Sequence, residues 1–429
     1  MNYTQTIEFL FSSLPSFQDK GATAYKPGLE RVTAFCRHLG NPQRNYFTIH
    51  VAGTNGKGSV SHMLASILQQ AGYRTGLFTS PHLTDFRERV KIDGQMISKQ
   101  KVVNFVDKHH DKMVELGLSF FEMTAALAFD HFAQSDCEVV VVETGLGGRL
   151  DATNIILPAV SVVTNVGLEH TDLLGDTVQK IAAEKAGIIK KSIPLILGEA
   201  NEEYNAVFEE VAAANKSKVI YAEQSFRIEK HHHEGDKQYF EIERLRDGYK
   251  YCFSVDLAGD YQYHNVLTAC AVADHLHEET PLTISRRAFV DGLSNVIGET
   301  SLRGRWQTLQ SEPRVICDTG HNAHGLRIVS EQLKGLDCNK LYCVIGFSKE
   351  KNLNEILPML PANAYYIFTQ ANISRAVDAA DLAAKAAEYG LCGEVVREVP
   401  QALSRAKELA TAEDVIFVGG STFVVAEVL

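Results

Sequence analysis

Short runs of apolar residues alternate with longer stretches of helical periodicity along most of the chain. Three early runs, at residues 47–51, 138–142 and 160–164, are apolar enough to be buried on both faces of a sheet. The first run leads through a glycine-rich turn into a predicted helix at residues 59–71. Repeated strand–helix–strand units of this kind build a mostly parallel sheet, so the pattern predicts an α/β fold.

From about residue 219 to residue 257 the helical periodicity gives way to an alternation of apolar and polar residues. Runs at residues 239–245 and 250–257 flank a short turn that contains Asp247 and Gly248. Alternating runs on either side of an Asp-Gly turn predict an antiparallel hairpin.

A less patterned stretch at residues 295–302 separates a predicted helix at residues 263–277 from the strands that follow. We place a domain junction there, which gives domains of residues 1–297 and 298–429. About 130 residues suffice for a compact, doubly wound, Rossmann-like α/β domain. The second domain has three helical stretches between its predicted strands and one after the last, and the strands cover residues 315–317, 341–345, 365–369 and 415–418.

Composition and charge narrow the functional classes. The 429 residues suit two domains, and a net charge of −11 at pH 7 argues against a nucleic-acid partner, because a polyanion would be repelled. No apolar run reaches the roughly 18 residues that cross a bilayer, and no signal peptide opens the chain, so we predict a cytoplasmic protein without membrane contact. The scattered cysteines lack metal-ligand spacing, and we interpret the tract His231-His-His as a solvated part of a polar loop rather than a metal site.

The strongest local signal is the segment Gly53-Thr-Asn-Gly-Lys-Gly-Ser59, at the end of a predicted buried strand. Glycines let backbone N–H groups face an anion, the following helix adds its positive end, and Lys57 can reach the outer phosphates of a nucleotide. The standard pattern G-x-x-x-x-G-K-[ST] fails twice, because Val51 replaces its first glycine and Gly58 follows the lysine. Phosphate binding is still favoured over a purely structural turn.

A carboxylate stands at the carboxyl end of the second apolar run. Glu143 follows four valines and precedes a glycine-rich segment that ends at Asp151. Ligands of open α/β sheets bind at this end of the strands, and a carboxylate oxygen there can hold Mg²⁺. The same pattern also fits a strand that ends in a tight loop, so both interpretations stay open.

Two further candidates follow the third apolar run. His170 lies a few residues past its end, where a metal or phosphate contact and a structural role are both open. Lys185 falls on the apolar stripe of a predicted helix at residues 176–189. Because burying an unpaired ammonium is costly, this lysine either snorkels, pairs with a carboxylate or loses its charge.

An acid and a histidine also follow the first predicted strand of the second domain. Asp318 and His321 come just after residues 315–317, and Arg305 lies near the predicted junction. Such groups suit a nucleotide that is held by one domain and closed over by the other, although neither cluster is diagnostic by itself.

Together these motifs resemble the folylpolyglutamate synthase/dihydrofolate synthase family, a branch of the Mur-type amide ligases. The resemblance spans nearly the whole chain and includes the departure from the standard P-loop pattern. It implies a P-loop-type, mostly parallel ATPase domain followed by a smaller glutamate-ligase domain with a Rossmann-like fold. The segments that carry it are residues 53–59, 79–83, 87–90, 143–154, 170–172, 184–188, 304–305 and 318–322.

The resemblance implies a site for ATP and Mg²⁺. Lys57 matches a catalytic residue that acts on the outer phosphates. The positions that match magnesium ligands are Ser80, Glu143 and His170, the last also a catalytic candidate. The positions that match nucleotide contacts are Gly53, Thr54, Asn55, Gly56, Lys57, Gly58, Ser59, Asn265, Arg305 and Asp318.

The resemblance also bears on Lys185, which matches a catalytic lysine that is carbamylated in this family. A carbamate would turn the buried cation into an anion able to face Mg²⁺.

Substrate contacts follow from the same resemblance. A pterin-bearing acid would lie near Phe121 and Asp151, where an aromatic ring can stack, and the incoming glutamate would meet His321 and Ser421. One departure from the family pattern is visible at residues 319–323, where Thr, Gly and a final Ala replace the usual alanine and proline.

The implied activity is ATP-dependent ligation of L-glutamate to dihydropteroate, to the γ-carboxylate of a (tetrahydro)folate, or to both. An acyl phosphate would form first, and domain closure near residues 295–302 would protect it from water. The alternatives are a cell-wall muramyl ligase of the same superfamily, which the segments at residues 79–83 and 143–151 disfavour, and a non-catalytic nucleotide-binding switch protein. The expected partners are small molecules only, and a monomer is expected.

Overall fold

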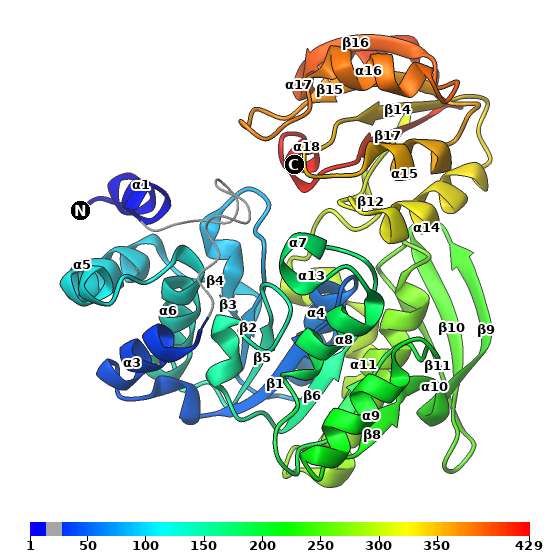
Figure 1. Ribbon diagram of the computed structural model, residues 1–429. Coiled ribbons are helices and arrows are strands. Elements are labelled where there is room, and N and C mark those ends of the chain that lie inside the picture. Colours follow the sequence, from blue (N-terminus) through cyan, green and yellow to red (C-terminus); the bar gives the residue numbers. More distant parts are fainter. Residues whose placement is uncertain (14–27) are drawn as a thin grey trace. The chain divides into compact units, whose positions relative to one another are not determined.

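The computed structural model describes residues 1–13 and 28–429, which form two compact units (Figure 1). The first unit comprises Met1–His232, Tyr239–Asp256 and Tyr263–Ser301, and the second comprises His233–Gln238, Leu257–Gln262 and Leu302–Leu429. The chain therefore passes between the units more than once. The sequence-based division between residues 297 and 298 falls inside helix α13 (Val296–Thr300).

The first unit is built on an eight-stranded sheet with the order β4-β3-β2-β5-β1-β6-β7-β8 (Figure 1). Neighbouring strands from β2 to β8 run parallel, and β3 and β4 form an antiparallel edge. The three early apolar runs are β5, β1 and β6 at the centre, as their composition predicts. The strands are β1 (Phe47–Ala52), β2 (Thr75–Phe78), β3 (Val90–Ile92), β4 (Gln95–Met96), β5 (Val139–Glu143), β6 (Val160–Val163), β7 (Leu195–Leu197) and β8 (Val219–Tyr221).

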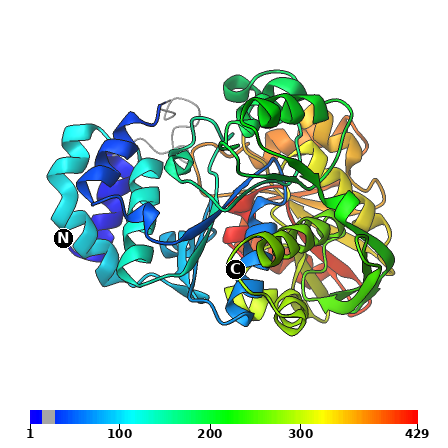
Figure 2. The ribbon, with the colours of Figure 1, turned by 90° about the horizontal axis from the view of Figure 1, so that it is seen from below.

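Helices pack against this sheet through their apolar faces. Helix α6 packs where β5 presents Val140 and Val142, and α8 and α9 pack over Ala52 and Val163. Figure 2 shows α1, α3, α5 and α6, coloured blue to cyan, gathered on one side of the unit. The helices are α1 (Tyr3–Ser13), α3 (Glu30–His38), α4 (Lys57–Gln70), α5 (Lys99–Leu116), α6 (Phe120–Gln134), α7 (Thr171–Leu174), α8 (Val178–Ala186), α9 (Asn205–Ala214), α10 (Ala222–Ser225), α11 (Gln262–Glu279), α12 (Arg286–Ser294) and α13, with short 3₁₀ turns η2 (Pro42–Arg44), η3 (Phe86–Arg89) and η4 (Ala152–Ile155).

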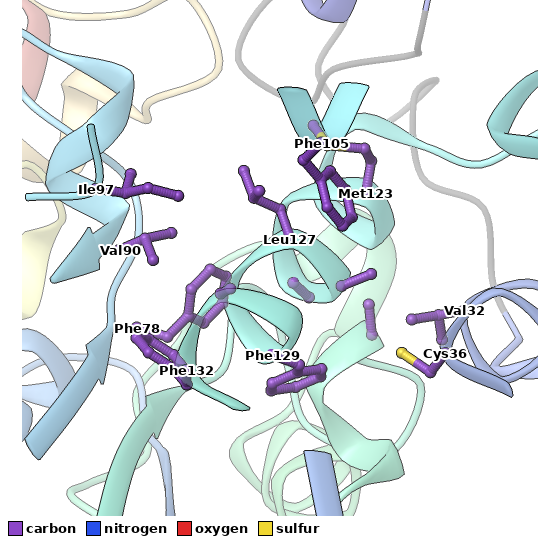
Figure 3. Close-up of a cluster of buried hydrophobic side chains, with 14 of the residues drawn as sticks. Val32, Cys36, Phe78, Val90, Ile97, Phe105, Met123, Leu127, Phe129 and Phe132 are labelled. Atoms are coloured by element: carbon purple, nitrogen blue, oxygen red, sulfur yellow. The ribbon is translucent and has the colours of Figure 1, made fainter. Parts of the chain in front are cut away.

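An aromatic core fills the space between β2, β5 and α6 (Figure 3). Phe78, Phe129 and Phe132 are fully buried in it. Gly76 of β2 is what lets α6 approach, because a Cβ there would lie 2.8 Å from the Phe132 ring and 2.9 Å from Val140. The core thus holds α6, and with it the residue Phe121, firmly against the sheet.

The alternating region forms a three-stranded sheet with the order β11-β10-β9. Strands β10 (Lys237–Arg244) and β11 (Tyr249–Val255) are the predicted hairpin, and β9 (Phe226–Glu234) is a third strand that the pattern did not reveal. The tract His231-His-His lies in β9, so its assignment to a loop is wrong. The His231 ring packs 4.7 Å from the Phe240 ring, and this aromatic contact holds the polar tract in the sheet.

The second unit contains a six-stranded sheet with the order β12-β13-β17-β14-β15-β16, parallel except for β12. Separate apolar clusters on its two faces make it doubly wound. The four predicted strands are β13 (Arg314–Cys317), β14 (Leu341–Ile345), β15 (Tyr365–Gln370) and β17 (Val415–Gly419), and the sequence missed the more exposed strands β12 (Gln307–Ser311) and β16 (Gly393–Glu398). The helices are α14 (Ala323–Lys334), α15 (Leu353–Ile356), α16 (Ala379–Ala387), α17 (Val399–Leu409) and α18 (Thr422–Ala426), with the turn η5 (Leu357–Met359).

Two predicted helices have different bounds in the structure. Helix α4 begins at Lys57 rather than residue 59, and α8 ends at Ala186, so Ile189 is buried in the turn beyond it.

The predicted domain junction contains a helix rather than an irregular stretch. This helix is α13, whose first N–H groups, at Val296 and Ile297, donate to the Asp256 carboxylate at 3.0 and 2.8 Å. Within the described residues, none of the helices is long and apolar enough to cross a membrane.

Candidate functional site

The glycine-rich segment forms a loop between β1 and α4. Gly53 and Gly56 adopt φ angles of +151° and +81°, which side chains rarely tolerate. A Cβ on Gly53 would lie 1.8 Å from Thr164 Oγ1, and one on Gly56 would lie 2.1 Å from Asn265 Oδ1. The glycines are therefore required both by backbone conformation and by the close approach of their neighbours.

The loop is held in place by the segment that follows β6. The N–H of Thr54 donates to Asn165 O at 3.0 Å, and the N–H of Asn55 donates to Asn165 Oδ1 at 2.9 Å. Lys57 curls back over the loop, where its Nζ donates to Gly53 O at 3.0 Å and Thr54 O at 3.1 Å. The ammonium group thus sits at the positive end of α4, an arrangement suited to an anion.

Glu143 lies beside this loop, because β5 pairs with β1 and places Glu143 opposite Val51. Its side chain is buried, and Oε2 accepts a hydrogen bond from the N–H of Ser80 at 2.9 Å. Arg89 is buried near Glu143, so burial lowers the pKa of Arg89 to about 10 while the carboxylate opposes that shift. A carboxylate oxygen is the kind of ligand that a hard divalent ion prefers.

The residues at this point suit a hard divalent cation. Among the described residues, no three His, Cys, Asp or Glu side chains converge to form a complete metal cage. Mg²⁺ usually takes one or two protein carboxylates and completes its shell with phosphate oxygens and water. Glu143, with Ser80 in contact and the glycine-rich loop beside it, fits that requirement.

His170 and Lys185 lie in the same unit. His170 takes a left-handed φ of +52° and immediately precedes α7. Lys185 is buried in α8, and its pKa is lowered to about 7, first by burial and then by Lys57, with Glu169 opposing the shift. Lys57 is thus close enough to lower the pKa of Lys185, which the sequence separation of their segments does not reveal.

The segment after Glu143 folds around Asp151. One carboxylate oxygen, Oδ2, accepts from the N–H groups of Gly145 and Leu146 at 2.8 and 2.9 Å. Gly145 lies directly under the Phe121 ring, since a Cβ there would be 2.4 Å from Cζ. Phe121 and Asp151 therefore belong to one local structure, and burial raises the pKa of Asp151.

Among the candidate residues in the second unit, Asp318 makes several hydrogen bonds to its surroundings. Its buried carboxylate accepts from Tyr261 Oη at 2.5 Å, from Trp306 N at 2.7 Å and from Gly320 N at 2.6 Å. Burial raises its pKa, and these hydrogen bonds together with Arg305 oppose the rise. Asp318 thereby organises the loop that follows β13.

The other candidates of the second unit lie at loop and helix ends. Arg305 donates to the hydroxyl of Thr319 and to Gly304 O. His321 Nδ1 lies 3.0 Å from Thr319 O, which fixes the proton on that nitrogen because a carbonyl can only accept. Ser421 is buried at the start of α18, where its Oγ accepts from Phe423 N at 3.2 Å.

The structure thus brings part of the predicted set together. The glycine-rich loop, Ser80, Glu143 and Asn265 lie together in the first unit, which also contains His170 and Lys185. The remaining candidates in the second unit are Arg305, Asp318, His321 and Ser421. Sequence reasoning passed over Arg89, Asn165 and Glu169, although each lies within or next to a quoted motif or strand end.

Two family models match the chain in succession. The Mur ligase middle domain matches residues 51–273, and the Mur ligase glutamate ligase domain matches residues 304–422. Together the two models cover most of the chain, in the order of its two α/β units, and they place it in the Mur ligase superfamily.

Individual relatives narrow this class. A probable bifunctional folylpolyglutamate synthase/dihydropteroate synthase of Haloferax volcanii is 34% identical over 100% of this chain, which spans only 50% of that protein. The solved structure of E. coli FolC in complex with DHPP and ADP has a TM-score of 0.86 and 30% identity, covering 100% of this chain and 97% of that one. A structure of a bifunctional folylpolyglutamate synthase/dihydrofolate synthase with Mn, AMPPNP and L-glutamate bound has a TM-score of 0.83 and 28% identity, covering 100% and 97%. The chain belongs to the folylpolyglutamate synthase/dihydrofolate synthase family.

Proposed function

We propose that this protein joins L-glutamate to dihydropteroate, to the γ-carboxylate of a (tetrahydro)folate, or to both, while converting ATP to ADP and phosphate. The observation that carries the proposal is the edge of the first sheet, where the loop with Lys57 lies beside the buried carboxylate of Glu143. Relatives that bind ADP with DHPP, or a nucleotide analogue with Mn and L-glutamate, support the same substrates. They do not favour a muramyl ligase or a non-catalytic switch.

We assign the ATP phosphates to the loop Gly53–Ser59, with Lys57 on the outer phosphates. Backbone N–H groups at the start of α4 and the Lys57 ammonium offset the negative charge that develops during phosphoryl transfer. Asn265 lies against Gly56 and is the proposed nucleotide contact of the first unit. Arg305 and Asp318 are proposed contacts from the second unit.

We assign the divalent ion to Ser80, Glu143 and His170. When bound, Mg²⁺ supplies charge neutralisation at the transferring phosphoryl group. The contribution of the chain is to orient Glu143, through the hydrogen bond that its Oε2 accepts from the N–H of Ser80.

The proposed reaction has two steps. A carboxylate oxygen of the acid attacks the γ-phosphorus, the bond from that phosphorus to ADP breaks, and an acyl phosphate forms. The neutral amine of glutamate then attacks the acyl carbon, phosphate leaves, and the nitrogen loses a proton as the amide forms. The acyl phosphate is needed because a free carboxylate is a poor electrophile.

We further propose that Lys185 is carbamylated. Its lowered pKa of about 7 leaves much of the amine neutral at physiological pH, and only the neutral amine can add to CO₂. The ammonium group first loses one proton, and the neutral amine then forms an N–C bond to CO₂ and loses a second proton. A buried cation is thereby replaced by an anion. Such an anion next to Lys57 relieves the repulsion that the two lysines otherwise share.

We assign the pterin-bearing acid to Phe121 and Asp151 and the incoming glutamate to His321 and Ser421. The Phe121 ring rests on the backbone of Gly145, which orders it as a platform for stacking. We propose a cytoplasmic monomer, and size-exclusion chromatography with light scattering tests the monomer.

The purified protein is expected to release ADP only when ATP, Mg²⁺, L-glutamate and a suitable acid are all present. Dihydropteroate and tetrahydrofolate are offered in separate reactions, each with a control that lacks glutamate. Turnover with both acids identifies a bifunctional synthase, and turnover with one assigns the step. Absence of acid-dependent ADP release from both reactions would reject the proposed activity.

Gly56→Ala is expected to raise the KM for ATP by about tenfold or more, because the new methyl group meets Asn265 and the φ of +81° becomes strained. The KM for the acid should change much less. Initial rates at varied ATP and varied acid measure both constants. Gly72→Ala is the matched control, since Gly72 has a φ of +89° but no neighbour within 4 Å of a Cβ; an unchanged KM for ATP in Gly56→Ala would count against this loop as the ATP site.

A further inference from the structure

A buried hydrogen-bond chain runs from β1 to the loop that follows β5. Asp151 Oδ1 accepts from the N–H of Thr153 at 2.9 Å and from Thr153 Oγ1 at 2.5 Å. The oxygen of that hydroxyl lies 2.8 Å from His50 Nε2. All three residues are buried.

The direction of each hydrogen bond follows from the chemistry of the groups. The Thr153 hydroxyl donates to Asp151 Oδ1, an oxygen that already accepts from the N–H of Thr153, so the hydroxyl oxygen is left to accept from His50. His50 therefore carries its proton on Nε2. Its Nδ1 has no hydrogen-bond partner among the described residues, and burial lowers the pKa of His50 to about 3, which keeps the ring neutral.

The carboxylate of Asp151, at one end of these hydrogen bonds, supports the proposed acid site. The other oxygen of Asp151 holds the N–H groups of Gly145 and Leu146, and the Phe121 ring rests on Gly145. If Thr153 or His50 stopped donating, the Asp151 carboxylate could rotate and release the turn. The ring would then lose the backbone surface against which it packs.

His50 lowers the stability of the fold at its buried position. A buried imidazole with one unpaired nitrogen destabilises the fold compared with an apolar side chain of similar size. Its neighbours in the adjacent strands are Val142, which has no polar side-chain atom, and Ser161, whose hydroxyl donates to Ile188 O at 2.9 Å instead. Residues that lower stability persist where they support function.

We propose that His50 and Thr153 are positioning residues for the acid substrate, acting through Asp151 on the Gly145–Leu146 turn and the Phe121 ring. This role rests on the proposed function. Neither residue needs to touch a substrate. The expected signature is a higher KM for the acid at an unchanged KM for ATP.

The test uses the 429-residue chain and four substitutions. Thr153→Val removes the hydroxyl at nearly constant volume and Thr153→Ser keeps it, whereas His50→Leu removes the donor and His50→Gln keeps an N–H group. We expect Thr153→Val to raise the KM for whichever acid the wild type uses by about tenfold, the scale of one lost hydrogen bond to a carboxylate. His50→Leu loses a hydrogen bond between neutral groups, so its KM for the acid should rise by about fivefold. The KM for ATP should stay within about twofold of wild type, and the serine and glutamine variants should recover most of the loss.

A matched control separates this role from general damage to the core. Thr75 is buried at the amino end of β2 and donates its hydroxyl to Tyr73 O at 2.9 Å, so Thr75→Val removes a similar hydrogen bond elsewhere. Its KM for the acid should match that of the wild type. A wild-type KM for the acid in Thr153→Val, or a parallel rise in the KM for ATP, would overturn the proposal.

A measurement that does not depend on catalysis separates the positioning role of His50 and Thr153 from the proposed ligase function. Hydrogen–deuterium exchange of the peptide that contains Gly145 and Leu146 should be faster in Thr153→Val and His50→Leu than in the wild type and in Thr75→Val. If the wild type turns over neither acid, the proposed function fails, and exchange still reports whether the chain holds the turn. Unchanged exchange in both variants would contradict the positioning role even if the enzyme is active.

Discussion

Lys57→Ala is expected to lower kcat for ADP release by about 10³-fold, which corresponds to about 4 kcal/mol of lost transition-state stabilisation. The ammonium lies over the glycine-rich loop, held by the carbonyls of Gly53 and Thr54, at the start of α4. No other part of the loop carries a full positive charge. Steady-state ADP release with saturating acid and glutamate measures the loss.

Lys57→Arg is the informative companion to this variant. Arginine keeps the charge, but its planar fork cannot reproduce the two contacts of a compact ammonium group, so only a small part of the activity should return. Thermal unfolding of both variants checks that the fold is retained. Turnover of Lys57→Ala within about tenfold of the wild type would remove Lys57 from the proposed chemistry.

Lys185→Ala is expected to lose most of the activity, and high bicarbonate should not restore it, because alanine has no amine to carbamylate. In the wild type, removal of CO₂ should lower activity and bicarbonate should recover it. Mass spectrometry under mild conditions at raised bicarbonate measures the added carboxyl group. Near-normal turnover of the alanine variant would reject the carbamate proposal.

Lys185 without the carbamate should also affect how the stability of the protein depends on pH. The pKa of Lys185 is lowered from its ordinary 10.5 to about 7 by burial and by Lys57. Between these values the unfolded chain binds more protons at this group than the folded chain does, so wild-type stability rises with pH across that window. Lys185→Met removes the buried charge, so it should unfold at a higher temperature than the wild type in CO₂-free buffer at pH 6. The difference should shrink as the pH approaches 10.

Lys180→Met provides the control for that comparison. Lys180 lies in the same helix but is exposed and paired with Asp176 at 2.8 Å, so its replacement should change the unfolding temperature little. A Lys185→Met variant that is less stable than wild type at pH 6 would show that the ammonium has a stabilising partner.

Buried central strands were predictable because a strand covered on both faces must be apolar throughout. The runs around Val140, Val162, Val344 and Ile416 meet that condition. Strands β9, β12 and β16 were not found, because their faces are largely exposed and their composition is polar. The buried strands β2 and β7 were also not found, because four and three residues are too short to give a periodic pattern. For the same reason the tract at residues 231–233 was assigned to a loop, whereas its partner strand and the Phe240 ring hold it in a sheet.

The candidate site was predictable to the extent that it follows strand ends. Glycines, Lys57 and Glu143 stand directly after buried runs, and the parallel order of β1 and β5 places them at one edge. The hydrogen-bond chain from His50 was not predictable, because His50 lies inside a strand and its partner Thr153 is more than a hundred residues away in the sequence. The burial of Lys185 was suspected, but its proximity to Lys57 depends on how α8 packs.

The sequence by itself determined the class of fold, the central strands and the position of the glycine-rich loop, since each depends on local periodicity or on residues close together in the chain. Tertiary structure alone decided which distant groups meet: Asn265 against Gly56, Ser80 against Glu143, and Phe121 against Gly145. Those contacts depend on strand order and helix packing, which arise from the burial of apolar surface as a whole. Local pattern therefore identified the parts of the site, and cooperative packing fixed their geometry.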